Sequence, residues 1–302
     1  MSNNNSLVAK NQRLGEKFLG FLFFACAFVS VITTAVVIVI IATETWGFFQ
    51  EVTVTEFLFG TEWTPLLNPK SYGILPLLTG TILIVVGSAA VALPVGVASA
   101  IYLSEYASDR VRNVVKPILE ILAGIPTVVY GFFALTFVTP MLKMVFPETN
   151  VFNAASAAIV VGIMVLPMVA SLCDDSLRAV PQALREGAYS LGGTSFEVTV
   201  RVVLPAALSG IFAAFVLAIS RAIGETMAVT LAAGATPNLT LNPLESIQTM
   251  TSYIVQVSLG DTPAGTLSYK TLFAVAAVLF SLTLVLNVLA NYVMTKYQEV
   301  YD

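Results

Sequence analysis

Residues 186–205 read EGAYSLGGTSFEVTVRVVLP and lie between two long apolar runs of the chain. The stretch predicts two short helices separated by the Gly-Gly pair at 192–193, which can form the left-handed cap that ends the first helix. Thr194 starts the second helix, and Glu197 three residues later completes a capping box. Pro205 ends or kinks this helix where the next apolar run begins. The segment therefore carries strong folding signals of its own.

The first of the two helices is expected to be amphipathic. Its apolar stripe has residues spaced four, four and three positions apart, namely Val180, Leu184, Ala188 and Leu191. Pro181 suits the first turn, and the charged side chains of Arg185 and Glu186 are expected to face away from the stripe. An ordinary connector is one interpretation of this segment. Connections are commonly about 4–6 residues long, whereas this one covers residues 174–205, which favours a dedicated role.

The composition indicates a membrane protein. The 302 residues are 57% hydrophobic and only 11% charged, with a mean hydropathy of +0.87, whereas a soluble domain carries about 25% charged residues. The net charge is −4 without a basic cluster, so nucleic acid is not expected as a partner. The chain has no histidine, and Cys26 and Cys173 lie in apolar runs, which argues against a zinc site and a Ser-His-Asp triad.

Six apolar runs are long enough to cross a bilayer, at residues 18–43, 74–103, 121–142, 151–173, 206–235 and 271–295. We therefore expect an all-α integral membrane protein with six transmembrane helices. The first run is too long for a signal sequence and has no clear cleavage site, so it is interpreted as an anchor.

Basic residues favour the cytoplasmic side of a membrane. They gather in the loops of one side, as Lys10, Arg13, Lys17, Arg110, Arg112, Lys116, Arg178, Arg185, Arg201 and Lys296. Both termini and the quoted stretch are thus predicted to be cytoplasmic. The opposite loops, at 46–72 and 237–270, are expected to be mostly solvated, with a docking surface for an extracytoplasmic partner as the alternative.

This topology divides the chain into three parts. Residues 1–73 hold the N-terminal tail, the first transmembrane helix and an extracytoplasmic segment. Residues 74–295 form a core of five transmembrane helices that includes the cytoplasmic segment at about 178–205. Residues 296–302 form the cytoplasmic C-terminal tail.

Two charges interrupt the fifth apolar run, in ISRAIGETMAV at 219–229. Arg221 and Glu225 are four residues apart, so they are expected to share one face of a helix. A lone charge at the bilayer centre costs about 3 kcal/mol, and the many small residues of this run allow close helix packing. One interpretation is a structural ion pair. The other is a substrate path in which the Arg221 guanidinium binds a tetrahedral oxyanion and Glu225 positions it.

The third run contains LAGIPTVVYGFFAL at 122–135. Pro126 predicts a kink in this span. Thr127 and Tyr130 follow it and are candidate polar residues lining a path. The chain has no Gly-Lys dipeptide and hence no Walker A phosphate loop. We expect no cofactor in this chain, and ATP, if it drives the protein, must bind another chain.

The quoted stretch resembles the cytoplasmic signature of ABC importer permeases, which reads Glu-Ala-Ala, three residues, Gly, nine residues, Ile, one residue and Leu-Pro. The residues in register are Glu186, Gly187 in place of the middle Ala, Ala188, Gly192, Val202 in place of Ile, Leu204 and Pro205. In that family the segment is the coupling helix, which sits in a cleft of a separate ATPase subunit. The resemblance thus implies that the partner ATPase binds ATP and Mg.

Further stretches are similar to phosphate-importer permeases of the PstC type: AIYLSEYASDRVR at 100–112, the run at 122–135, RAIGETMAVTLAAG at 221–234 and SLGDTPAGTLSYKTLF at 258–273. The resemblance implies the type I ABC importer permease fold and phosphate as substrate. It also implies a heterodimer with a second homologous permease in the lipid of the bacterial plasma membrane, two ATPase subunits and an extracytoplasmic phosphate-binding protein.

Two alternatives remain besides a permease for another oxyanion. A proton-coupled secondary transporter would use Arg221 and Glu225 for protons, but it predicts internal repeats, which are not evident, and it leaves the cytoplasmic signature unexplained. A membrane enzyme would need catalytic groups, and the chain offers neither histidine nor an evident nucleophile–base pair.

Overall fold

The computed structural model describes the backbone of residues 5–297, and this part of the chain is almost entirely helical. Five segments are long and apolar enough to cross a membrane: α1 (Asn5–Phe49), α3 (Leu75–Ile101) with its π-helical extension η1 (Tyr102–Tyr106), α5–α6 (Thr127–Val145), α7 (Ala154–Arg178) and α14 (Leu267–Tyr297). A bent pair, Ser195–Ala206 with α11 (Leu208–Ile223), adds a sixth when counted as one span. The predicted six-span, all-α membrane fold is confirmed.

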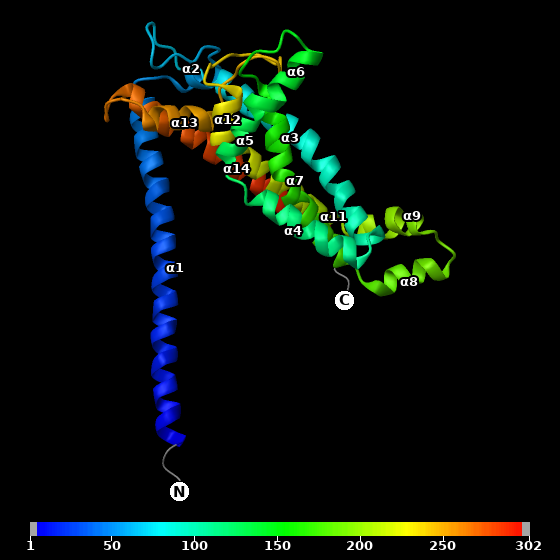
Figure 1. Cartoon of the computed structure of the whole chain (residues 1–302). Coiled ribbons are helices and arrows are strands. Elements are labelled where there is room, and N and C mark those ends of the chain that lie inside the picture. The colour runs from blue at the N-terminus through cyan, green and yellow to red at the C-terminus, as the bar shows by residue number, and fades with distance from the viewer. Residues whose placement is uncertain (1–4, 298–302) are drawn as a thin grey trace.

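The core of the molecule is the contact between α3 and α7, which lie side by side along most of their length (Figure 1). Glycines bring the two backbones close together. A Cβ added to Gly96 would lie 2.6 Å from Val169 Cγ1, and one added to Gly87 would lie 2.7 Å from Ala158 Cβ. Lipid provides no hydrophobic force between apolar helices, so packing at this distance supplies the attraction.

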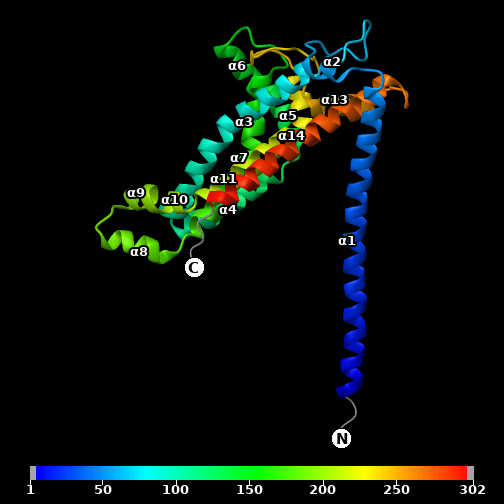
Figure 2. The ribbon, with the colours of Figure 1, turned by 180° about the vertical axis from the view of Figure 1, so that it is seen from behind.

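α1 stands apart from the other helices for most of its length (Figures 1 and 2). It meets α14 at one end, while its apolar side chains, such as Phe21 and Phe23, are largely exposed. The N-terminal part of α1, the C-terminal part of α14 and the pair α8 (Gln182–Ser190) and α9 (Ser195–Val198) lie toward the same end, called here the α8 end.

The opposite end, called here the α2 end, is a packed cap. It contains α2 (Val54–Phe59) and α13 (Met250–Leu259). Aromatic side chains from segments far apart in sequence bury one another, and the rings of Trp63 and Tyr253 lie 4.9 Å apart between centroids. Many residues of these loops are exposed, as predicted, but several of their aromatic residues form a second apolar core that the prediction missed.

Two of the predicted spans are broken rather than continuous. α4 (Asp109–Ala123) ends before Pro126, which caps α5 (Thr127–Phe133), since proline cannot donate a backbone hydrogen bond and restricts the residue before it. The predicted run 121–142 thus straddles a break. The run 206–235 is also wrong as one helix, because α11 ends at Ile223 and α12 (Met227–Ala233) begins anew. Irregular backbone within a membrane is tolerated where protein buries it or a cavity adjoins it.

We predict that the α8 end faces the cytoplasm. Ser190→Cys and Asp261→Cys place one thiol at each end, at exposed positions, in a background in which Cys26 and Cys173 are replaced. A membrane-impermeant maleimide applied to intact cells is expected to label only the Asp261→Cys protein, and to label both after lysis. If only the Ser190→Cys protein were labelled in intact cells, the α8 end would face outward and the predicted orientation would be wrong.

Candidate functional site

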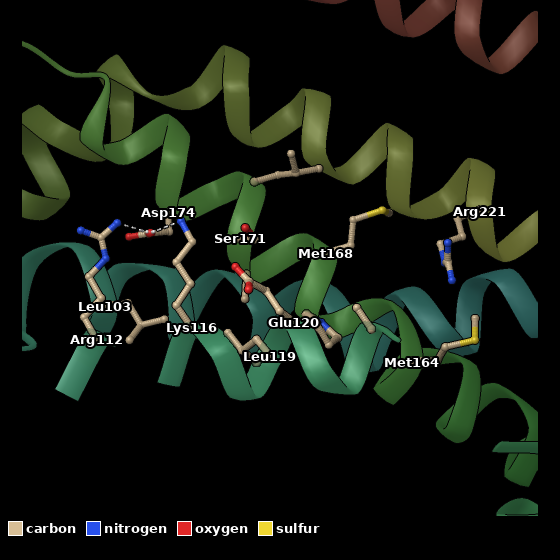
Figure 3. A pocket seen from close by; sticks show the side chains of 14 residues that line it. Leu103, Arg112, Lys116, Leu119, Glu120, Met164, Met168, Ser171, Asp174 and Arg221 are labelled. Carbon is tan, nitrogen blue, oxygen red and sulfur yellow. Dashed lines mark hydrogen bonds and ion pairs between the residues drawn. The ribbon is translucent and has the colours of Figure 1, made fainter. Parts of the chain in front are cut away.

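A cavity of about 310 Å³ opens between α4, α7 and α11 (Figure 3). Apolar side chains, among them Met164 and Met168, form most of its wall. Its charged lining residues are Arg112, Lys116 and Glu120 from α4, Asp174 from α7 and Arg221 from α11. The cavity thus combines a low-dielectric wall with a small set of charges from three helices.

α4 supplies its charges because of its amphipathic pattern. Arg112, Lys116 and Glu120 recur every four residues and share one face, which lines the cavity. The apolar stripe of α4 (Val111, Val114, Ile118 and Ile121) is exposed. The helix therefore turns its charges toward the protein and its apolar stripe outward, as suits contact with lipid or with another membrane subunit.

Asp174 is the centre of an ion cluster at the α8 end of the cavity. Its side chain is 2% exposed, and its Oδ2 lies 2.8 Å from Arg112 Nη2 and 3.9 Å from Lys116 Nζ. Arg178 Nε lies 3.5 Å from Asp174 Oδ1, and Lys116 also pairs with Asp175 at 3.3 Å. Because three cations share the one buried carboxylate, Asp174 is the member whose removal would leave the others without their common partner. These contacts fix α4 against α7.

Arg221 and Glu225 do not form the predicted pair. Arg221 is exposed near the end of α11 and lines the cavity, whereas Glu225 is buried within the break between α11 and α12. The carboxylate of Glu225 accepts a hydrogen bond from Ala228 N at 3.3 Å, and its backbone carbonyl accepts one from the Thr251 hydroxyl at 2.8 Å. The shared helix face was wrong because α11 ends at Ile223. Among the described side chains no ion pair or hydrogen bond is found for the Arg221 guanidinium.

Thr127 and Tyr130 lie on α5, beside the break, and neither lines the cavity. Tyr130 is buried, and its hydroxyl donates to the carbonyl of Leu122 at 2.9 Å, so it closes the gap between α4 and α5. Thr127 is half-buried in the first turn of α5. A role for either residue in a path stays a prediction.

The segment at 178–205 folds largely as its turn residues predict. α8 ends at Ser190, and Gly192 adopts φ +85°, the left-handed conformation of a helix cap. Thr194 and Glu197 form the predicted capping box. The pKa of Glu197 lies below its ordinary value, chiefly because the Thr194 backbone N–H donates to the carboxylate. Pro181 caps α8 from outside its first turn.

Two side chains of this segment differ from the expectation. Leu191 is 91% exposed, because the helix has ended and the residue no longer follows the helical period. Arg185 was predicted to face outward, but its side chain is only 12% exposed and pairs with Glu105. Leu184 and Ala188 do pack against the core as expected.

The residues of the sequence signature lie along this projecting segment. Glu186 and Gly187 are exposed on α8, and Ala188 is half-buried. Gly192 lies in the turn between α8 and α9. Leu204 packs against the core and Pro205 is exposed, in the short α10 (Leu204–Ala206) that precedes the 68° bend into α11.

The ion pairs made by Arg112, Asp174 and Arg185 were missed by reasoning from sequence. The periodic charges of α4 and an aspartate at the end of the fourth apolar run gave a signal for the Asp174 cluster. No pattern pointed to the Arg185–Glu105 pair, whose members are far apart in sequence.

Comparison with known proteins identifies relatives over nearly the whole chain. The family described as "Binding-protein-dependent transport system inner membrane component" matches residues 92–298. The probable ABC transporter permease protein YqgH of Bacillus subtilis is 30% identical over 95% of this chain and 93% of its own length. The phosphate transport system permease protein PstC of Xylella fastidiosa is 31% identical over 88% of this chain and 89% of its own. The phosphate transport system permease protein PstC 1 of Mycobacterium tuberculosis is 34% identical over 78% of this chain and 80% of its own length.

Solved structures support the fold. A chain of a bacterial ABC transporter involved in the import of alginate has a TM-score of 0.64 at 16% identity, covering 95% of this chain and all of that chain. A chain of the MetNI methionine ABC transporter has a TM-score of 0.55 at 17% identity, covering 75% and 95%. The predicted type I ABC importer permease fold is confirmed.

The relatives also confirm that the chain is a transport subunit and not an enzyme. Its apolar helices make it a multi-pass membrane protein. On the family match and the relatives together, the chain belongs to the binding-protein-dependent transport system inner membrane components, the permeases of ABC importers.

Proposed function

We propose that the chain is a permease subunit of an ATP-driven importer of inorganic phosphate in the bacterial plasma membrane. The family assignment supports an importer, and the PstC relatives support phosphate. The structural observation that supports an anionic substrate is the position of the Arg221 guanidinium. It lines the cavity at the break of the fifth span, and no partner for it is found among the described residues.

The charges of the cavity suit a passing oxyanion. Arg112 is matched by Asp174 at 2.8 Å, so Arg221 is the cation best able to engage a ligand. Its planar fork offers paired donors to a tetrahedral anion. Glu120 lies between Lys116 and Arg221 along the cavity (Figure 3). Its carboxylate supplies the negative charge in the path that the sequence analysis had assigned to Glu225. A path must attract its ion without trapping it, and Glu120 would weaken retention.

Three parts of the surface support the proposed partners: α8, the α2 end and the apolar stripe of α4. The exposed residues Glu186 and Gly187, on a helix that projects from the bundle, fit docking to one of the two ATPase subunits of the complex, which bind ATP and Mg. The packed α2 end fits a phosphate-binding protein. The exposed apolar stripe of α4 beside the cavity fits a second, homologous permease that completes the path as a heterodimer. Another oxyanion remains the alternative substrate, since a guanidinium also binds sulfate or molybdate.

Substitution of Arg221 tests the path. Arg221→Met removes the charged hydrogen bonds to the anion, worth about 1.5–3 kcal/mol, so ATP-dependent phosphate uptake by the complex is expected to fall by roughly tenfold or more. Arg221→Lys keeps the charge but loses the fork and should fall less. The control is Arg110→Lys, at an exposed arginine of α4 outside the cavity lining, which should transport normally.

A double variant separates this role from a structural one. If Arg221 and Glu225 only balance each other, Arg221→Met with Glu225→Gln should restore near-normal uptake at matched membrane levels. The structure shows no such pair, so we expect no restoration. Near-normal uptake by the double variant would refute the path.

A substitution in the turn after α8 tests the proposed coupling to the ATPase. Gly192 has φ +85°, which valine adopts only with strain. Gly192→Val is therefore expected to leave membrane insertion intact but to lower both ATPase co-purification and uptake severalfold. Gly20→Val is the matched control, because a Cβ there meets no atom within 4 Å and the residue does not have a positive φ. Full uptake by the Gly192→Val protein would count against the coupling role.

A further inference from the structure

α8 is attached to the bundle by few side chains. It projects with α9 from the end of the molecule (Figures 1 and 2), and none of its residues is fully buried. Leu184 and Ala188 contact the apolar core. Apart from its chain connections to α7 and α9, α8 therefore has only a small contact through which force can reach the spans.

Arg185 is the polar part of that contact. The Nη1 atom of its guanidinium pairs with the carboxylate of Glu105, and the Nη2 atom donates to the carbonyl of Leu177 at 2.7 Å. The Arg185 side chain is 12% exposed and that of Glu105 is 7% exposed. One planar fork thus joins α8 to two different spans in a largely dry environment, where the interaction is strong.

Both acceptors lie at the ends of the central helix pair. Glu105 is in η1, the π-helical extension of α3, and its other oxygen accepts the Ser104 hydroxyl at 2.8 Å. Leu177 is in the last turn of α7, where a cation satisfies a terminal carbonyl and complements the helix dipole. Since α3 and α7 are packed through glycines, Arg185 holds α8 against what is mechanically one unit.

The same end of α7 carries the link to the cavity. Asp174, one turn before Leu177, pairs with Arg112 of α4 at 2.8 Å. α4 supplies three of the charged residues that line the cavity. One polar contact therefore joins α8 to the end of α7, and a second joins α7 to the wall of the cavity, with the α7 backbone between them.

We propose that Arg185 is a positioning residue that locks α8 to the ends of α3 and α7, so that the three move as one rigid body and carry ATPase closure to the cavity. This inference rests on the proposed function of α8 as the coupling helix. It assigns the pair to energy coupling, separate from docking of the ATPase, which uses the exposed face of α8.

The first test measures uptake and ATP hydrolysis together, in proteoliposomes that contain the complete complex, with inorganic phosphate as the substrate. Arg185→Gln and Glu105→Gln are expected to keep ATPase co-purification but to lower the phosphate taken up per ATP hydrolysed by at least fivefold. A merely structural pair would lower the amount of complex and leave this ratio unchanged. Arg201→Gln, at an exposed arginine of the same segment, should leave the ratio at the wild-type value.

A second test does not depend on the stability of a broken pair. Arg185→Cys with Glu105→Cys, with Cys26 and Cys173 replaced, is joined by a bis-thiol reagent of about the span of the two side chains. Rigid-body movement predicts that the joined protein regains coupling relative to the unjoined one. If joining abolishes the remaining uptake, α8 must move relative to α3, and the inference is overturned.

The controls separate this inference from the proposed function. ATP-driven phosphate uptake by the wild type with an unchanged ratio in Arg185→Gln would overturn the inference alone. Absence of ATP-driven phosphate uptake by the wild-type complex would overturn the proposed function, and the inference with it.

Discussion

The contact between α3 and α7 is the constraint on which the other helices depend. In lipid, apolar helices gain little from meeting one another, so association requires close backbone approach. Gly162 illustrates the constraint, because an added Cβ would lie 2.8 Å from Val91 Cβ and 3.0 Å from the Ser88 carbonyl. The small residues of these helices are thus the physical basis of the core.

Each functional element is attached to this pair by a different interaction. α4 is held by the Asp174 cluster, α8 by Arg185, and α11 by a face of alanines that packs on α3 and α7. The α2 end is connected through close packing as well, since a Cβ on Gly80 would lie 2.5 Å from the Gln248 carbonyl. Charges therefore hold α4 and α8, and apolar packing holds the rest.

Whether a helix is held by ion pairs or by glycine packing affects how readily it can move between conformational states. The Asp174 cluster, in which three cations share one carboxylate, can be remade in a second arrangement, whereas glycine contacts lose their packing when the backbones separate. Changes between states are thus expected in α4, in the break between α11 and α12, and at Arg221. The breaks at Pro126 and Gly224 flank this region, so irregular backbone and the charged lining of the cavity occur together.

The sequence predicted the features that depend on local pattern. Apolar length predicted the spans, and the turn residues predicted the cap at Gly192 and the capping box at Thr194. It failed where tertiary contacts decide. The helix period suggested a pair between Arg221 and Glu225, but Glu225 instead caps α12 and contacts Thr251, a residue distant in sequence. The helix period placed Arg185 outward, but its partner Glu105 lies on another span and draws the side chain inward.

The most direct test of the account is ATP-driven uptake by the complete complex in proteoliposomes, with labelled phosphate, sulfate and molybdate supplied separately. The account predicts that phosphate accumulates only with ATP, and that Arg221→Met lowers this accumulation while the complex stays assembled. Accumulation of sulfate or molybdate but not phosphate, or phosphate uptake driven by a proton gradient without ATP, would contradict it.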